Sequence, residues 1–315
     1  MPEYPDLELY CESIEQRFAG QPLSRVRVAS PFLLRSYDPP LSAVAGKTLH
    51  KMSRLGKRLV FHLDDHLYLV LHLMIAGRLR EKPAGAPVPG KVGLAAFDFA
   101  ASRLANTGAS TLILTEASPK KRASLHVVHG AEALAALDPG GLEPFTLSVT
   151  QFGQQLRAEN HTLKRSLTDP HLFAAIGNAY SDEILHRAGL SPVQLTSRLK
   201  DDDIARLHEA TRTVLTEWTD RLRAEAKGAF PDKVTAFHKQ MAAHGKFGKP
   251  CPVCGEPIQR IVRASNEANY CPRCQTGGKL LADSSLSRLL RDDWPATPEE
   301  LEEQKRSHRE KTSRN

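Results

Sequence analysis

Four cysteines near the C-terminal end constrain the fold of this chain more than any other feature. They form two Cys-x-x-Cys pairs, Cys251 with Cys254 and Cys271 with Cys274, separated by sixteen residues. Two residues between thiolates let one tight turn present both sulfurs to the same ion, and two such turns complete the tetrahedral set that Zn²⁺ prefers. Disulfides or a redox pair are the alternatives, but the doubled spacing favours zinc. Because four thiolates leave no position open for water, we predict one structural Zn²⁺ ion.

The chain has the composition of a globular protein with room for two or three domains. It has 315 residues, of which 41% are hydrophobic and 25% charged. The longest apolar stretch, Leu67 to Ile75, is far shorter than the roughly 20 residues of a membrane helix, and no signal peptide opens the chain. We therefore expect a cytoplasmic protein without membrane contact. The net charge of +7 permits binding to a polyanion without establishing it.

The first 140 residues combine one helix with short β-like segments. Apolar residues recur at helical spacing between Asp6 and Ala19, and Cys11 shares that amphipathic face as a small buried hydrophobe. Six runs between turn residues predict strands. They are Arg25–Val28, Arg58–Leu63, Leu67–Leu73, Gly93–Phe99, Thr111–Glu116 and Leu125–Val128. Residues Glu81 to Lys91, rich in proline and glycine, predict a loop. We expect residues 1–140 to form a β-sandwich with a flanking N-terminal helix.

The chain then becomes helical over residues 150–240. The clearest helix is Asp201 to Ala226, whose apolar stripe indicates core packing. Residues from Thr162 to Gly189 predict a helix, a turn and a second helix, with Asn178 as N-cap, acidic residues in the first turn and Gly189 past the end. Asn178 is either a plain cap or part of a turn that directs backbone N–H groups at phosphate. The finger follows at 245–280 and a C-terminal tail at 281–315. Its last stretch, roughly Pro298 to Asn315, is mixed in charge and is expected to be partly helical or disordered.

The opening residues Met1, Pro2 and Glu3 carry a chemical possibility. Removal of Met1 exposes a secondary amine, and an α-amino group has an ordinary pKa near ~8, so part of it is uncharged and nucleophilic at neutral pH. Glu3 then stands beside it as an acid. The alternative is a frayed, solvated terminus, and these three residues do not decide between the two.

Four features in order resemble the formamidopyrimidine-DNA glycosylase and endonuclease VIII superfamily. The opening Met-Pro-Glu-Tyr-Pro-Asp-Leu-Glu is similar to the family's Met-Pro-Glu-Leu-Pro-Glu-Val-Glu. Arg54-Leu-Gly-Lys57 resembles its lysine segment, Gly177-Asn178 its helix-two-turn-helix element, and the four cysteines its zinc finger. The resemblance implies a multidomain α+β protein with an N-terminal β-sandwich, a helix-two-turn-helix domain and a C-terminal zinc-ribbon finger.

The resemblance also implies a function in base-excision repair. Pro2, freed of Met1, would attack C1′ of a damaged nucleoside and form a Schiff base, while Glu3 protonates the departing system. Lys57 would contact the phosphate near the lesion and assist strand cleavage, and Asn178 would hold the backbone of kinked duplex DNA. The target nucleotide must be flipped out of the stack. We expect a monomer that binds double-stranded DNA with damaged bases or abasic sites in the bacterial cytoplasm or nucleoid.

Two departures from the family pattern limit what can be transferred. Asn266 aligns with the finger arginine that takes part in the second, δ, elimination, and asparagine has no charge. We therefore hypothesise that strand cleavage stops mainly at β-elimination; Arg263 could supply a charge from another direction. The residues that fill the hole left by the flipped nucleotide also differ, because Ile75, beside Met74, takes the methionine position and lysines such as Lys120 replace arginines.

The segment from Gly228 to Val234 does not match the family segment that recognises 8-oxoguanine, so the sequence leaves the lesion open. The favoured function is a glycosylase with AP lyase activity. The alternative is a catalytically reduced protein that binds damaged or abasic DNA. A zinc-ribbon nucleic-acid module of unrelated function is a more distant possibility, which the combination of Pro2, Glu3 and Lys57 argues against.

Overall fold

The computed structural model describes residues 1–102, 107–231, 237–263, 266–281 and 295–301, together with 303, 304 and 306. The chain divides into two compact units. The first contains Met1–Gly141 and Leu215–Ala236, and the second contains Leu142–Val214 and Phe237–Asn315. Helix α6 (Asp201–Ala226) contributes to both. Each unit is described by itself.

The first unit begins with helix α1 (Tyr4–Phe18), which starts two residues earlier than the expected Asp6. Pro5 lies in the first turn, where its missing N–H costs nothing. The carboxylate of Asp6 accepts a hydrogen bond from the backbone N–H of Glu3, the N-cap residue, at 2.9 Å. This hydrogen bond at the first turn determines the residue at which the helix begins. The spacing of apolar residues does not reveal it.

Eight strands of this unit form two four-stranded layers of a β-sandwich, as predicted. Their order is β5-β7-β6-β1-β2-β3-β4-β8, and the layers are joined only where β1 and β2 pair at two positions. Phe61 of β3 and Phe97 of β6 stack between the layers with ring centroids 5.8 Å apart. The strands are β1 (Pro22–Val28), β2 (Lys47–Leu55), β3 (Arg58–Leu63), β4 (Leu67–His72), β5 (Gly77–Pro83), β6 (Gly93–Phe99), β7 (Ser110–Glu116) and β8 (Ser124–His129).

Two of these strands, β2 and β5, were not among the runs named from the sequence. Strand β5 extends to Pro83, so the prediction of a loop from Glu81 onward is wrong for Glu81 to Pro83. It lies at the edge of the sheet and pairs only with β7, so its polar side chains face away from the core and its apolar alternation is weak. Strand β2 is likewise rich in polar, half-exposed residues.

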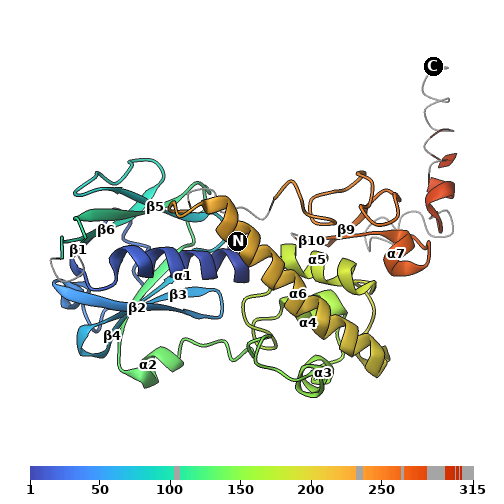
Figure 1. The fold of residues 1–315 in the computed structure, drawn as a ribbon, viewed down its shortest axis with the longest axis horizontal. Coiled ribbons are helices and arrows are strands. Elements are labelled where there is room, and N and C mark those ends of the chain that lie inside the picture. The colour runs from blue at the N-terminus through green and yellow to red at the C-terminus, as the bar shows by residue number, and fades with distance from the viewer. Residues whose placement is uncertain are drawn as a thin grey trace. The chain divides into compact units, whose positions relative to one another are not determined.

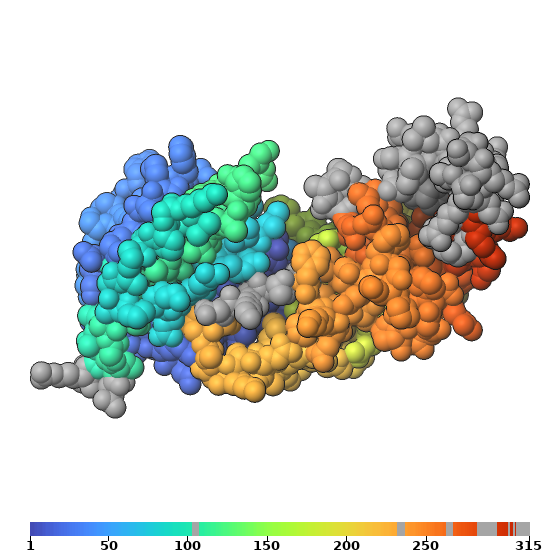
Figure 2. Space-filling model, turned by 90° about the horizontal axis from the view of Figure 1, so that it is seen from above, coloured from blue at the N-terminus to red at the C-terminus, as the bar shows by residue number. Residues whose placement is uncertain are grey.

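Helix α1 closes the sandwich core. In Figure 1 it runs between the layer with β5 and β6 above it and the layer with β2 and β3 below it, and the upper layer covers most of it in Figure 2. Leu7, Tyr10, Ile14 and Phe18 are fully buried, and the Phe18 ring lies 4.4 Å from that of Phe99. Burial at this scale contributes about 1.5–3 kcal/mol per large apolar side chain. Cys11 is also buried, as expected.

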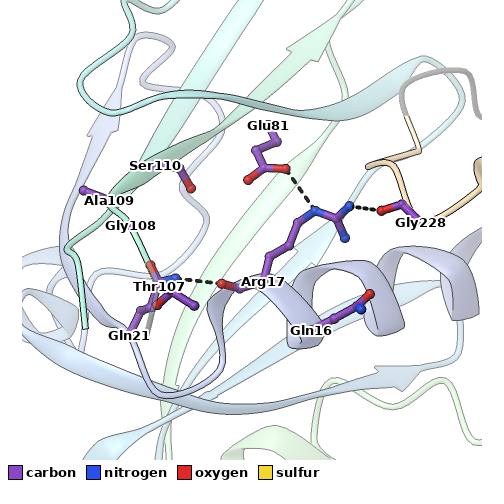
Figure 3. Close-up of a pocket in the computed structure, with 9 residues that line it drawn as sticks. All are labelled: Gln16, Arg17, Gln21, Glu81, Thr107, Gly108, Ala109, Ser110 and Gly228. Carbon is purple, nitrogen blue, oxygen red and sulfur yellow. Dashed lines mark hydrogen bonds and ion pairs between the residues drawn. The ribbon is translucent and has the colours of Figure 1, made fainter. Parts of the chain in front are cut away.

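The C-terminal part of α6 is fastened to α1 by charged and aromatic contacts. Arg223 pairs with Glu12, and the Phe230 ring lies 6.0 Å from that of Tyr10. Figure 3 shows the Arg17 side chain reaching between the Glu81 carboxylate, at 3.0 Å, and the carbonyl of Gly228. These contacts hold Gly228 and Phe230, at the start of the segment from Gly228 to Val234, against α1. Residues 232–236 lie outside the described residues.

The second unit packs four helices around an apolar core and carries a zinc-finger hairpin. Helices α3 (Val149–Arg157), α4 (Leu163–Thr168) and α5 (Asn178–Ala188) precede α6, which has the predicted bounds. Phe152, Phe173 and Leu207 are fully buried among them. The hairpin consists of β9 (Gln259–Arg263) and β10 (Asn266–Tyr270), followed by the short helix α7 (Pro272–Thr276). Four short helices complete the described elements. The first unit contains α2 (Ala131–Ala135) and the 3-10 helices η1 (Leu41–Val44) and η2 (Asp64–His66), and the second contains the 3-10 helix η3 (Thr196–Arg198).

The predicted helix, turn and helix are present, but two details of α5 were wrong. Gly177 is the N-cap and Asn178 the first helical residue, since Gly177 has the extended backbone of a cap. The first turn contains no acidic residue, because Asp182 and Glu183 lie one turn further on and are buried. The predicted end is correct: Gly189 adopts the left-handed conformation at φ 65°.

No helix among the described residues is long and apolar enough to cross a membrane.

Candidate active site and zinc centre

The N-terminal residues are buried at the start of α1. Pro2 is buried and Glu3 is only 2% exposed, so the terminus is not a frayed segment. A carboxylate at the N-terminal end of a helix is favoured by the helix dipole. Burial lowers the pKa of the N-terminal amine of Met1, the Glu3 charge opposes this shift, and Arg78 and Lys57 add to it. A lowered pKa increases the nucleophilic, uncharged fraction of an amine in this position.

Asp6 supplies a second buried carboxyl beside Glu3. Oδ2 accepts the Glu3 N–H, whereas Oδ1 is buried without a hydrogen-bond partner in the described part of the chain. Burial raises the pKa of Asp6 to about 7, although the hydrogen bond from Glu3 opposes the shift. The sequence analysis assigned no role to this residue, and its position at N3 of the cap was the available signal.

Lys57 lies in the turn between β2 and β3, directly after Gly56, which has a positive φ of 55°. Burial lowers the pKa of Lys57, and the charge of Glu3 raises it. Lys57 therefore lies within electrostatic range of Glu3 and of the N-terminal amine of Met1, the residue before Pro2.

Arg54 connects the lysine turn to the terminal helix. Its Nε donates to Oε1 of Glu8 at 2.8 Å, and its guanidinium lies 4.5 Å from the ring centroid of Tyr4. A second nitrogen donates to the carbonyl of Gly56 at 3.1 Å. The Arg54 side chain is 8% exposed. Arg54 thereby holds the residue before Lys57 against α1, a role that its place in the sequence does not reveal.

Ile75 and Lys120 lie on one cavity of about 310 Å³ in the first unit. Ile75 is 66% exposed on the turn between β4 and β5, and Met74 before it adopts a positive φ of 53°. On the other side, the carboxylate of Glu116 accepts the backbone N–H groups of Arg122 and Ala123 and so shapes the segment that contains Lys120. An exposed apolar side chain held on a constrained turn suits insertion into a base stack.

In the second unit, Asn178 is half buried at the start of α5, and its carbonyl accepts a hydrogen bond from Nζ of Lys164 at 2.9 Å. Lys164 also pairs with Asp182, which is fully buried. The second oxygen of Asp182 binds His244 at 2.8 Å and Asn269 at 3.2 Å. This network ties α4, α5 and β10 together around the Gly177-Asn178 turn.

Glu183 connects α5 to the segment before the finger. Its two carboxylate oxygens accept the backbone N–H groups of Ala242, Ala243 and His244 at 2.8–2.9 Å. Buried carboxylates that accept several backbone N–H groups hold a segment firmly. Asn266 begins β10, but its side chain and that of Arg263 lie outside the described residues, as does most of the predicted tail.

The four predicted cysteines form a metal centre. All four sulfurs lie within 4.8 Å of one another, with Cys251 and Cys274 at 3.9 Å and Cys254 and Cys271 at 3.4 Å. A zinc ion bound tetrahedrally at about 2.3 Å separates its sulfurs by about 3.8 Å. Ile258 packs beside the buried Cys251 and Cys271. The donor set fits one structural Zn²⁺.

Comparison with known families matches all three parts of the chain. The Formamidopyrimidine-DNA glycosylase N-terminal domain matches residues 1–122 and its H2TH domain residues 137–224. The zinc finger found in FPG and IleRS matches residues 248–277.

Individual relatives cover most of the chain. A formamidopyrimidine-DNA glycosylase of Heliobacterium modesticaldum is 32% identical over 87% of this chain and its own full length, and one of Roseiflexus is 31% identical with the same coverage. The solved structure of Lactococcus lactis Fpg with DNA containing an abasic site has a TM-score of 0.76 and 26% identity, covering 87% of this chain and 99% of its own.

The fold, the buried terminus and the finger thus define a DNA glycosylase of base-excision repair. The chain belongs to the formamidopyrimidine-DNA glycosylase family.

Proposed function

We propose that this DNA glycosylase is also an AP lyase and that Pro2, after removal of Met1, is its nucleophile. The observation that carries the proposal is the burial of Pro2 and Glu3 at the start of α1, within electrostatic range of Lys57. A buried secondary amine beside a carboxyl and a cation is suited to attack on a sugar carbon.

In the proposed reaction, the Pro2 nitrogen bonds to C1′ as the bond from C1′ to the damaged base breaks. The proton that the Pro2 nitrogen loses leaves with the base, and Glu3 supplies a second proton to the ring oxygen as the sugar opens, which leaves an iminium. Loss of a proton from C2′ then expels the 3′-phosphate by β-elimination, and Lys57 holds that phosphate. Water finally hydrolyses the iminium and restores the amine.

The other predicted residues would hold the substrate. We propose that Asn178 and the first N–H groups of α5 bind the DNA backbone, that Ile75 fills the space left by the flipped nucleotide, and that Lys120 contacts the opposite strand. The four cysteines hold Zn²⁺, which shapes the finger. We further propose that the protein acts as a monomer in the bacterial cytoplasm, and sedimentation of the pure protein tests the first part.

Borohydride trapping on abasic-site DNA tests the nucleophile. Wild type should give a stable covalent adduct, whereas protein with an acetylated terminus should give none. Lys57→Met is the matched control: it should retain the adduct, because Lys57 is not the attacking amine. An undiminished adduct after blocking the terminus, or no adduct with wild type, contradicts the proposal. The second outcome would favour a protein that binds lesions without turnover.

We also propose that cleavage ends mainly at β-elimination, because Asn266 carries no charge. Gel analysis of the products should show mostly 3′-unsaturated aldehyde ends with wild type and more 3′-phosphate ends with Asn266→Arg. Mostly 3′-phosphate ends with wild type contradict this part of the proposal and leave the role of Pro2 untouched.

A further inference from the structure

A histidine from the DNA-binding helix contacts the zinc centre. Nε2 of His186, in the last turn of α5, lies 3.2 Å from Sγ of Cys251. Both residues are buried, with 8% and 2% exposure. His186 lies outside the Cys-x-x-Cys motifs, and nothing in the sequence pattern marked it.

The chemistry of the two atoms assigns the direction of this hydrogen bond. A cysteine that binds zinc is a thiolate and has no proton to give. The imidazole must therefore carry its proton on Nε2 and donate it to the sulfur. Such a bond withdraws electron density from one thiolate of a centre whose four thiolates and one Zn²⁺ sum to a charge of −2.

Other contacts show that α5 serves as the platform for the finger. Gln275 of α7 donates to the carbonyl of Leu190, just after α5, at 2.9 Å, and accepts the N–H of Cys271 at 2.8 Å. Asn269 of β10 reaches Asp182 in the middle of α5. The His186 contact is the one link among these that ends on a cysteine sulfur.

We propose that His186 is a positioning residue of the zinc centre: its Nε2–H donates to the Cys251 thiolate, retains the metal and couples the finger to α5. Groups that hydrogen-bond to metal ligands commonly change metal affinity by about 10- to 100-fold. The bond should also lower the reactivity of the Cys251 thiolate, because the shared electron pair is less available to electrophiles. The proposal does not depend on the lyase activity.

Three variants separate the hydrogen bond from packing. His186→Phe keeps an aromatic ring and removes the donor. His186→Gln restores an N–H close to the position of Nε2. Gln275→Leu, the matched control, removes the buried hydrogen bond from the finger to the Leu190 carbonyl and one within the finger, from the backbone N–H of Cys271, but leaves every donor to sulfur in place.

Two measurements are made on the full-length protein. Competition with a chromogenic chelator should show zinc affinity roughly 10-fold weaker in His186→Phe and largely restored in His186→Gln. In cobalt(II)-substituted protein, the sulfur-to-cobalt charge-transfer band should move to lower energy in His186→Phe, since the thiolate becomes more electron-rich. The band should not move in Gln275→Leu.

An unmoved band in His186→Phe, or a band that moves equally in Gln275→Leu, overturns the proposal. If His186→Phe does not fold, NMR of isotope-labelled histidine in zinc-loaded wild type decides by itself. The Nε2–H tautomer supports the hydrogen bond to sulfur, and the Nδ1–H tautomer overturns it.

Discussion

Arg54 on β2 binds Glu8 on α1 through a hydrogen-bonded ion pair of 2.8 Å, while its guanidinium also supports the Gly56 carbonyl just before Lys57. The Arg54 side chain is 8% exposed and that of Glu8 is 27% exposed. This pair links the two chain segments that carry Glu3 and Lys57, which are separated by more than fifty residues. The distance in space between Glu3 and Lys57 thus depends on Arg54, a residue that need not touch substrate.

Replacing Arg54 with methionine should destabilise the protein and disturb the site. Removing one partner of a mostly buried pair leaves the other charge poorly compensated, and we expect a loss of about 2 kcal/mol in the free energy of unfolding. Chemical denaturation measures the loss, and borohydride trapping under folded conditions should show a reduced yield. Arg206→Met, which breaks a more exposed pair with Asp203, is the control and should change stability by less than about 0.5 kcal/mol. Equal effects of the two substitutions would contradict the role of Arg54.

Asp6 should make stability fall as the pH rises through neutrality. Its pKa is about 7 in the folded protein against 3.8 as the ordinary value, so between these values the folded state binds more protons than the unfolded state. The contribution of Asp6 to the free energy of unfolding is therefore largest below about pH 4. It is lost, by as much as about 4 kcal/mol, as the pH rises to about 7 and just beyond. Asp6→Asn removes the ionisation. The difference in unfolding free energy between the variant and wild type should shift in favour of the variant from pH 5 to pH 8, and a constant difference would refute the assignment.

Gly77 should tolerate no side chain. A Cβ at this position would lie 2.2 Å from the carbonyl oxygen of Leu73, which accepts the Gly77 N–H in the turn that presents Ile75. Gly77→Ala should therefore lower the unfolding free energy by about 2 kcal/mol or more, because backbone must move. Gly90→Ala is the matched control, since a Cβ there meets nothing within 4 Å. Similar melting temperatures for the two variants would show that the turn adapts.

The five cysteines should react in two classes once zinc is removed. Burial raises the pKa of Cys11 to about 12, and its thiol lies within 3.4 Å of the Ser53 carbonyl, so it should stay unreactive while the first unit is folded. A thiol reagent should label few cysteines in the zinc-loaded protein, four after chelation and five in denaturant. Mass spectrometry locates the labels. Labelling of Cys11 together with the other four after chelation would indicate that metal loss also opens the first unit.

The sequence by itself determined the features that arise from residues close together along the chain. The spacing of the cysteines identified the metal ligands, since each Cys-x-x-Cys turn is local. The bounds of α6, β3 and β6 were predicted from the apolar residues along each segment, because those residues are the ones that the fold buries. The resemblance to the family then linked Pro2, Glu3 and Lys57.

Only the tertiary structure decided which polar groups are buried and what they meet. Strand β5 has a charged sequence and is a strand because β7 pairs with it. Arg54 and His186 carry no local signal that distinguishes them from exposed charged or polar residues, and the signal for Asp6 is limited to its place at the third residue of α1. Their pKa values, ion pairs and hydrogen bonds come from desolvation and from partners distant in sequence, and both exist only once the chain has folded.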